Sequence, residues 1–230
     1  MNYFYFDIET VPIFQSEEEY FKARETLEHD EMTPKTNRSL YYKIRKGMLN
    51  PFDGKIVAIT YQHNDEKLHI LREWKSSECE ILQEFFNCVD KATEDGWNSR
   101  NPLTYVGFNI LHFDIPFLFC RMQHHKIITS WRGHELNRLF RRLYQFSIDL
   151  LQVHLPQNDY NLKGLSHDKL CNAYGLPTKN VTGKIVTDLY YKEEHEKIEE
   201  YVRKEFVYPQ LFRKILNDGI VNKSKFSQVS

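Results

Sequence analysis

The 230-residue sequence predicts an α/β domain built around a mixed sheet. Three patterns predict this class. Residues 3–10 are an aromatic run typical of a strand, residues 55–73 hold two more apolar runs, and residues 77–89 repeat apolar side chains at helical spacing. A strand, a hairpin, a helix, a strand and then further helices is the element order of an α/β domain with parallel and antiparallel pairs.

The first strand is followed by a long charged stretch, residues 17–50, which has helical patches and a proline at Pro34. We interpret it as an insertion that lies over one edge of the functional site. Strands are predicted at residues 55–62 and 67–73. His63-Asn-Asp65 between them has the composition of a hairpin turn.

A helix is predicted to begin after Ser77, because Ser77 and Glu80 have the spacing of a capping box. Its apolar positions recur as one stripe, which we assign to the core and not to a cofactor site: Ile81, Leu82, Phe85, Phe86 and Val89. The remaining elements follow in order: a strand over 103–109, a helix over about 116–126, a short strand over 146–150, a helix ending near Gly175 and a last helix carrying Tyr201 and Glu205.

Composition bounds the domain organisation. With 41% hydrophobic and 14% aromatic residues, the chain can bury a sizeable core, and we predict one domain over residues 1–230 with a flexible tail over 222–230. Four scattered cysteines without a C-x-x-C pair argue against a zinc site and a disulfide framework, and fit a reducing cytosol. No long apolar run or signal sequence is present, so we expect a cytoplasmic protein with no membrane partner.

The net charge of −1 gives no overall basic character that would indicate a nucleic-acid partner. Two stretches are nevertheless locally basic, and each could contact phosphates or be an ordinary solvated helix face. Their members are Arg121, Lys126, Arg132, Arg138, Arg141 and Arg142 in one stretch, and Lys35, Arg38, Lys43, Arg45, Lys46 and Lys55 in the other. The ten histidines lack metal-ligand spacing, and we expect them at the surface.

Four carboxylates in three remote segments carry the functional prediction. Asp7 and Glu9 are two residues apart in the first strand, so they project from the same face. Asp114 follows the strand at 103–109, where the chain turns into a helix, and Glu205 lies one helical turn after Tyr201. Neighbouring anions need a cation, and carboxylate oxygens suit Mg²⁺ or Mn²⁺ better than zinc.

Three motifs give a specific resemblance. Phe6-Asp-Ile-Glu-Thr10, Asn109-x-x-x-Phe-Asp114-x-Pro116 and Tyr201-x-x-x-Glu205 resemble the exonuclease motifs of the tyrosine branch of the DEDD superfamily. The chain is similar above all to stand-alone proteins related to the proofreading exonuclease domain of family-B DNA polymerases. The resemblance implies a ribonuclease-H-like fold with a central five-stranded mixed sheet flanked by helices. Arg121 and the Asp149-Leu150 segment support it.

The resemblance also implies roles at two divalent cations, Mg²⁺ or Mn²⁺. Asp7 would bridge the ions, Glu9 and Glu205 would complete the site that activates water, and Asp114 would hold the second ion. Tyr201 would orient the attacking water; its alternative is a core aromatic. Thr10, Asn109 and Phe113 would contact the terminal nucleotides, and their alternatives are a turn residue, a strand-end cap and a core residue.

Position 205 departs from the family, which has aspartate there. We hypothesise that Pro209 compensates by kinking the helix near the longer Glu205 side chain. The leading functional hypothesis is a 3′-5′ exonuclease that hydrolyses single-stranded DNA to 5′-mononucleotides. The alternatives are an exoribonuclease or oligonucleotide-degrading enzyme, and a weak or inactive nucleic-acid-binding module. We favour DNA over RNA as the partner; the sequence names no protein partner.

Overall fold

The computed structural model describes residues 2–29, 38–98, 100–127, 142–178 and 184–220. Pro34, Lys35, Arg132, Arg138, Arg141 and the predicted tail at 222–230 lie outside the described residues. The first half contains β1 (Asn2–Pro12), α1 (Glu17–His29), α2 (Arg38–Lys46), η1 (Gly47–Leu49), β2 (Gly54–His63), β3 (His69–Arg72), η2 (Glu73–Lys75) and α3 (Glu78–Asn98). The second contains β4 (Leu103–Gly107), α4 (Asp114–His124), β5 (Ser147–Asp149), α6 (Leu150–His154), η4 (Pro156–Asn158), α7 (His167–Ala173), α8 (Lys184–Tyr191), α9 (His195–Glu205) and α10 (Tyr208–Asp218).

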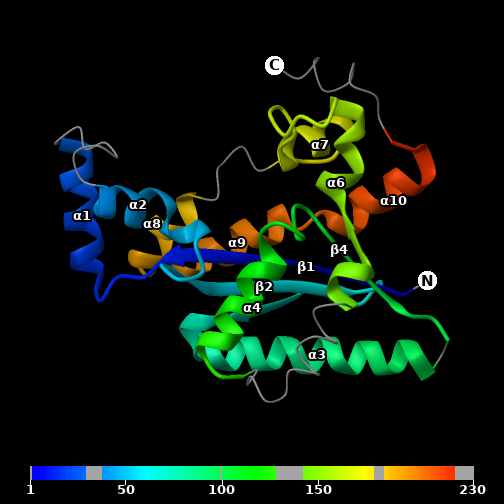
Figure 1. Ribbon diagram of the computed structural model, residues 1–230, viewed down its shortest axis with the longest axis horizontal. Helices are drawn as coiled ribbons and strands as arrows, with labels where there is room; N and C mark the ends of the chain where they lie inside the picture. Colours follow the sequence, from blue (N-terminus) through cyan, green and yellow to red (C-terminus); the bar gives the residue numbers. More distant parts are fainter. Residues whose placement is uncertain (1, 30–37, 99, 128–141, 179–183, 221–230) are drawn as a thin grey trace.

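The strands form one five-stranded sheet in the order β3-β2-β1-β4-β5. The β1–β2 and β2–β3 pairs are antiparallel, whereas the β1–β4 and β4–β5 pairs are parallel. Helix α3 runs along one face of the sheet and α9 and α10 along the other (Figure 1). The predicted class, a mixed five-stranded sheet flanked by helices, is confirmed.

Strand β1 is the middle strand of the sheet, and both of its faces are covered. Phe4 and Phe6 point to the α3 side, where both rings contact Phe85 at centroid distances of 6.0 and 5.7 Å. On the opposite face, Tyr5 packs with α10 and Val11 with α8 and α9. Burial on both faces explains the near-continuous apolar and aromatic run in the sequence.

The predicted cap and stripe of α3 are confirmed. The backbone N–H of Glu80 donates to Ser77 Oγ at 3.3 Å, and Ser77 Oγ donates to Glu80 Oε2 at 2.8 Å. All five stripe residues are buried in the core on this side of the sheet. The hairpin turn is confirmed as well, since Asn64 adopts a left-handed conformation with φ of 49° between β2 and β3.

The boundaries after β4 differ from the prediction. The strand ends at Gly107, two residues before Asn109, because Asn109 has a φ of 62° and cannot continue an extended strand. Helix α4 begins at Asp114 and ends at His124, so it lies two residues earlier than predicted at both ends. Asp114 is therefore the first residue of the helix and not a residue in the loop before it.

The prediction of one kinked C-terminal helix is wrong. Helix α9 ends at Glu205, and α10 begins at Tyr208 with Pro209 in its first turn. Proline is tolerated there because the N–H it lacks has no intrahelical acceptor at that position. Phe212 consequently belongs to α10 and packs against Tyr5, not alongside Val202 on α9.

The charged stretch after β1 is attached to the rest of the domain through α8. Tyr20 of α1 stacks on Tyr191 with ring centroids 4.5 Å apart, and Arg24 Nη1 lies 2.5 Å from Asp188 Oδ1. The end of the stretch is tied to β1, where Thr10 Oγ1 donates to the carbonyl of Met48 at 2.5 Å. Its interpretation as an insertion stays a prediction.

The four cysteines, Cys79, Cys88, Cys120 and Cys171, are free thiols. Within the described residues, no helix combines the length and apolar character that crossing a membrane requires.

Candidate active site

Asp7 and Glu9 lie on the face of β1 that is covered by the C-terminal helices. On one side of them is the apolar cluster that contains Tyr5 and the α10 side chains, and on the other is the cluster that contains Val11 and the α9 side chains. The two acids therefore occupy a polar interval between two hydrophobic clusters on the same sheet face, as their spacing in the strand predicts.

Asp114 is brought directly against this strand. Its side chain is buried, and Oδ1 accepts a hydrogen bond from the backbone N–H of Ile8 at 3.0 Å. Strand β1 pairs with β4 only as far as Tyr5, which leaves the Ile8 N–H available to a side chain beyond the end of β4. Because Ile8 stands between Asp7 and Glu9, this bond joins the first and second predicted motifs.

The turn that delivers Asp114 is held by Asp149, at the end of β5. Its Oδ1 accepts from the Asn109 N–H at 2.8 Å, and its Oδ2 accepts from the Leu111 N–H at 3.0 Å. Gly107 permits a close approach to β1, since a Cβ there would lie 2.8 Å from the carbonyl oxygen of Phe6. In the sequence, Asp149 is indicated only by the resemblance, because its bonds to the backbone exist only in the folded turn.

Tyr201 and Glu205 lie one turn apart on α9, and the Tyr201 hydroxyl is hydrogen-bonded to the Glu205 side chain. Burial, the charges of Glu9 and Glu205, and this hydrogen bond raise the pKa of Tyr201 far above its usual value of 10.0. Tyr201 is also part of the apolar cluster under α9. It is at once a core aromatic and a protonated donor beside two of the predicted acids.

Tyr208 contacts one of the predicted acids, although no sequence motif indicates it. Its buried hydroxyl donates to Asp7 Oδ1 at 2.9 Å. Burial, followed by the negative charge of Asp7, raises its pKa well above the usual value. The contact depends on the break between α9 and α10, and a single continuous helix, as the sequence pattern predicts, would not indicate it.

The electrostatics of the site are those of crowded anions. Burial and then the charge of Asp7 raise the pKa of Asp114 well above 3.8, although the Ile8 N–H bond opposes the shift. The pKa of Asp149 is also raised, mainly by burial. A carboxylate pair of this kind favours either a bound proton or a bound cation.

The three predicted nucleotide contacts have structural partners in the fold. Thr10 holds the Met48 carbonyl, Asn109 forms the left-handed turn after β4, and half-buried Phe113 packs on Phe117 with centroids 5.5 Å apart. Asn109 and Phe113 thus have the structural roles named as their alternatives, whereas Thr10 lies within β1 and is not a turn residue. Their contacts with nucleotides stay predictions.

The donor set at the site consists of carboxylate oxygens, which suit Mg²⁺ or Mn²⁺. In the described segments, however, no three histidine, cysteine, aspartate or glutamate side chains are placed to hold one ion together. By their chemistry the residues fit a hard divalent cation.

For two residues of the basic stretches, neither the phosphate contact nor the solvated helix face is what the structure has. Arg121 is buried and binds Glu78 through two hydrogen bonds of 2.8 and 2.6 Å, so it is not a phosphate ligand. Lys55 Nζ lies 2.8 Å from Glu73 Oε1 and 2.7 Å from the Tyr190 hydroxyl. Local charge along the sequence does not reveal such partners, because they come from other elements.

The expectation of surface histidines is wrong for His154, which is fully buried and bonded to the Tyr174 hydroxyl at 2.8 Å. His125 is half-buried and lies 2.7 Å from Glu78 Oε2. Both carry structural contacts, and neither lies among the predicted acids.

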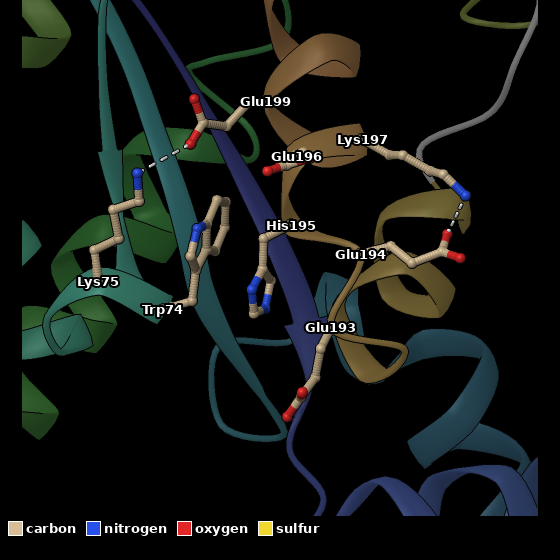
Figure 2. A pocket seen from close by; sticks show the side chains of 8 residues that line it. All are labelled: Trp74, Lys75, Glu193, Glu194, His195, Glu196, Lys197 and Glu199. Atoms are coloured by element: carbon tan, nitrogen blue, oxygen red, sulfur yellow. Dashed lines mark hydrogen bonds and ion pairs between the residues drawn. The ribbon is translucent and has the colours of Figure 1, made fainter.

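A pocket of about 450 Å³ lies at the start of α9 (Figure 2). The rings of Trp74 and His195 stack there at 4.9 Å, and the Glu194–Lys197 and Lys75–Glu199 ion pairs flank them. The pocket is lined by none of the predicted site residues, and its four glutamates disfavour a nucleic-acid ligand. We do not assign the predicted chemistry to it.

The sequence profile of a family described as a predicted 3′-5′ exonuclease related to the exonuclease domain of PolB matches residues 50–226. The chain belongs to this family. The matched region contains Asp114, Tyr201 and Glu205, whereas Asp7 and Glu9 precede it. No curated protein matches the chain.

Proposed function

We propose that the protein is a metal-dependent 3′-5′ exonuclease that removes 5′-mononucleotides from single-stranded DNA. Membership of a predicted 3′-5′ exonuclease family supports the nuclease class. The observation that carries the proposal is the bond between Asp114 and the Ile8 N–H. It places the carboxylate of the second motif beside the strand that holds both acids of the first.

Asp7, Glu9, Asp114 and Glu205 are the residues that would hold two divalent cations, Mg²⁺ or Mn²⁺. When bound, such a pair would lower the pKa of a water and stabilise the negative charge of the leaving oxygen. The protein's part is to orient the acids. Ile8 fixes one oxygen of Asp114, and Tyr208 fixes one oxygen of Asp7.

Tyr201 acts as a donor in this proposal and not as a base. Its raised pKa keeps the phenol protonated at neutral pH, and its hydroxyl is already directed at Glu205. A protonated phenol at this position orients an attacking water, while proton removal falls to other groups.

The experiment is a product ladder from a 5′-labelled single-stranded DNA oligonucleotide in Mn²⁺ or Mg²⁺, with EDTA as the metal-free arm. We expect stepwise shortening from the 3′ end that EDTA abolishes. Asp7→Ala and Asp114→Ala should each lower the rate at least about 10²-fold, the scale of losing one group that stabilises transition-state charge. Asp65→Ala is the matched control, since Asp65 is an exposed aspartate paired with Arg213.

An RNA oligonucleotide of the same sequence tests the exoribonuclease alternative. This test is needed because none of the proposed residue roles depends on the 2′-hydroxyl, which distinguishes RNA from DNA. Faster shortening of RNA than of DNA would assign that activity instead. Retained binding with no ladder on either substrate would leave the inactive binding module, for which Glu205 in place of aspartate is the reason. The cytoplasmic location stays a prediction.

A further inference from the structure

The segment that runs from η1 to the first residue of β2 exposes a large aromatic side chain close to the end of β1. We call this segment, residues 47–54, the Phe52 loop. Phe52 is 81% exposed and Leu49 is 54% exposed, and both are well above the exposure of ordinary core-facing residues. Ile13, directly after β1, is also partly exposed. It lies next to the loop, since its N–H donates to the Asp53 carbonyl at 2.8 Å.

The loop is held in one conformation by its own hydrogen bonds. The N–H groups of Gly54 and Phe52 donate to the carbonyl and the side-chain oxygen of Asn50, at 2.8 and 3.1 Å. Gly54 is tightly enclosed, since a Cβ there would lie 2.6 Å from the Gly47 carbonyl oxygen. Phe52 is therefore exposed on a fixed support, which lowers the entropy that a ligand must overcome on binding.

The loop is fastened to both elements that carry the first two motifs. From β1, Thr10 Oγ1 donates to the Met48 carbonyl at 2.5 Å. From α4, Arg121 Nη1 donates to the Pro51 carbonyl at 3.1 Å. At about 3.3 Å per strand residue, Pro12 at the end of β1 lies about 10 Å along the strand from Glu9. The loop is within reach of the same extended polymer that the acids would engage.

The chemistry of the loop suits a base and not a phosphate or a protein surface. Asp53 is the one charged residue among residues 47–54, so the loop has no positive charge to attract a phosphate. Three apolar side chains are also far less than the roughly 800 Å² that each partner buries in a stable protein interface. Stacking of one unpaired base needs only one rigid aromatic ring.

We propose that Phe52, supported by Leu49, is a stacking platform for an unpaired base of the single-stranded nucleic acid, upstream of the nucleotide at the acids. This inference rests on the proposed function, which supplies the ligand. It adds a specificity for single strands, because a base in a duplex has no open face to offer the ring.

The test is binding of a fluorescent oligothymidine of about ten nucleotides, measured in an Asp7→Ala background that prevents cleavage. Phe52→Ala should weaken binding roughly 5- to 150-fold, the range of one base–aromatic stack. Phe52→Trp should retain it. Tyr160→Ala is the matched control, because Tyr160 is a 76% exposed aromatic in a loop that is bonded neither to Thr10 nor to Arg121.

An abasic oligonucleotide of the same length separates stacking from a structural effect. Phe52→Ala should leave its binding unchanged, since it has no base to stack. Equal losses on both oligonucleotides, no loss on oligothymidine, or an equal loss from Tyr160→Ala would each overturn the proposal. Unchanged thermal unfolding of Phe52→Ala is expected, given the exposure of the side chain.

The two proposals fail separately. If the wild-type chain shows Phe52-dependent binding but no product ladder, the nuclease activity is wrong and the platform stands. If the ladder forms and Phe52→Ala changes neither binding nor KM, the platform is wrong and the nuclease stands. If the Asp7→Ala chain does not bind oligothymidine at all, the platform is overturned whatever the ladder shows.

Discussion

Glu78 and Asp114 are two buried carboxylates that the fold treats in opposite ways. Glu78 is 6% exposed and Asp114 is 1% exposed. Both are linked to α4, which begins with Asp114 and carries the partner of Glu78, Arg121, two turns later. Because the two acids are similarly buried, comparing them isolates the effect of the surrounding groups.

Glu78 is neutralised by the protein itself. Arg121 binds both of its oxygens, His125 lies 2.7 Å from Oε2, and the Ile56 N–H donates to Oε1 at 2.8 Å. Burial alone would raise the pKa of Glu78, but these hydrogen bonds and the Arg121 charge lower it below 4.5. The network fixes the start of α3 to α4 and β2.

Asp114 receives a neutral donor, the Ile8 N–H, and faces the negative charge of Asp7. Its pKa is raised where that of Glu78 is lowered. Glu78 therefore joins α3, α4 and β2, whereas burial and the charge of Asp7 disfavour the charged form of Asp114. A strongly shifted pKa of this kind is common at functional sites.

The largest expected effect is a loss of stability when the Glu78–Arg121 network is broken. Glu78→Gln should destabilise the protein by about 3–5 kcal/mol, because it leaves the buried Arg121 charge without its counter-ion. Urea unfolding measures the loss as a lower midpoint at unchanged slope. Glu78→Leu combined with Arg121→Met should lose much less than the single change, since no charge is left buried. A loss below about 1 kcal/mol from Glu78→Gln would contradict the network's role.

The pH dependence of that loss has a defined sign. Because the folded-state pKa of Glu78 is lowered, its stabilisation is fully present above 4.5 and disappears as the pH falls through the folded-state value. The difference between wild type and Glu78→Gln should therefore be constant above pH 4.5 and shrink below it.

The next largest effect is expected on Mn²⁺ affinity, through the orientation of Asp7 by Tyr208. Tyr208→Phe removes the hydroxyl that holds Asp7 and should weaken Mn²⁺ binding about 10- to 100-fold, the usual result of losing a partner of a metal ligand. Titration calorimetry with Mn²⁺ measures this without turnover. Tyr174→Phe is the matched control, a buried tyrosine bonded to His154. Equal Mn²⁺ affinity in both variants would remove Tyr208 from the site.

Asp114→Asn should change stability with the opposite sign to Glu78→Gln. Asparagine can still accept from the Ile8 N–H, but it carries no charge to bury beside Asp7. A raised folded-state pKa means that wild-type stability falls as the pH rises above 3.8 toward the folded-state value. In EDTA the variant should melt higher than wild type at pH 7, and this gain should vanish below about pH 3.8.

Added Mn²⁺ sharpens the same measurement. It should raise the melting temperature of wild type more than that of Asp114→Asn, because a ligand stabilises only the state that binds it. A variant that melts lower than wild type at pH 7 in EDTA would show that Asp114 supports the fold as Glu78 does.

The smallest effect is expected at an exposed ion pair, Arg213 with Asp65. Asp65→Asn should change the unfolding free energy by about 0–1 kcal/mol, because water screens the pair. High salt should abolish any difference in unfolding free energy between wild type and Asp65→Asn. A larger change would mean that solvent exposure does not explain why this pair contributes less to stability than the Glu78 network.

Local patterns in the sequence predicted the elements whose signals are short in range. The Ser77 cap, the Asn64 turn and the apolar stripe of α3 each depend on residues within a few positions, and the structure has all three. The division between α9 and α10 was not predicted, because helical periodicity continues through residues 198–212. The helix is interrupted there because Tyr208 and Phe212 belong to a different hydrophobic cluster from Tyr201.

The candidate site divides in the same way. The sequence supplied the acids and their motifs, and the family match supports the exonuclease class. It could not supply Tyr208 on Asp7, or the partners of Arg121 and Lys55, because each contact joins segments that are remote along the chain.

By itself the sequence determined the sheet-forming runs, the capped core helix and the carboxylates at strand ends, because spacing and side-chain type act locally. Only the tertiary structure decided which buried acid is neutralised. Glu78 meets a guanidinium and Asp114 meets another carboxylate, and that choice depends on which segments the packed core brings together.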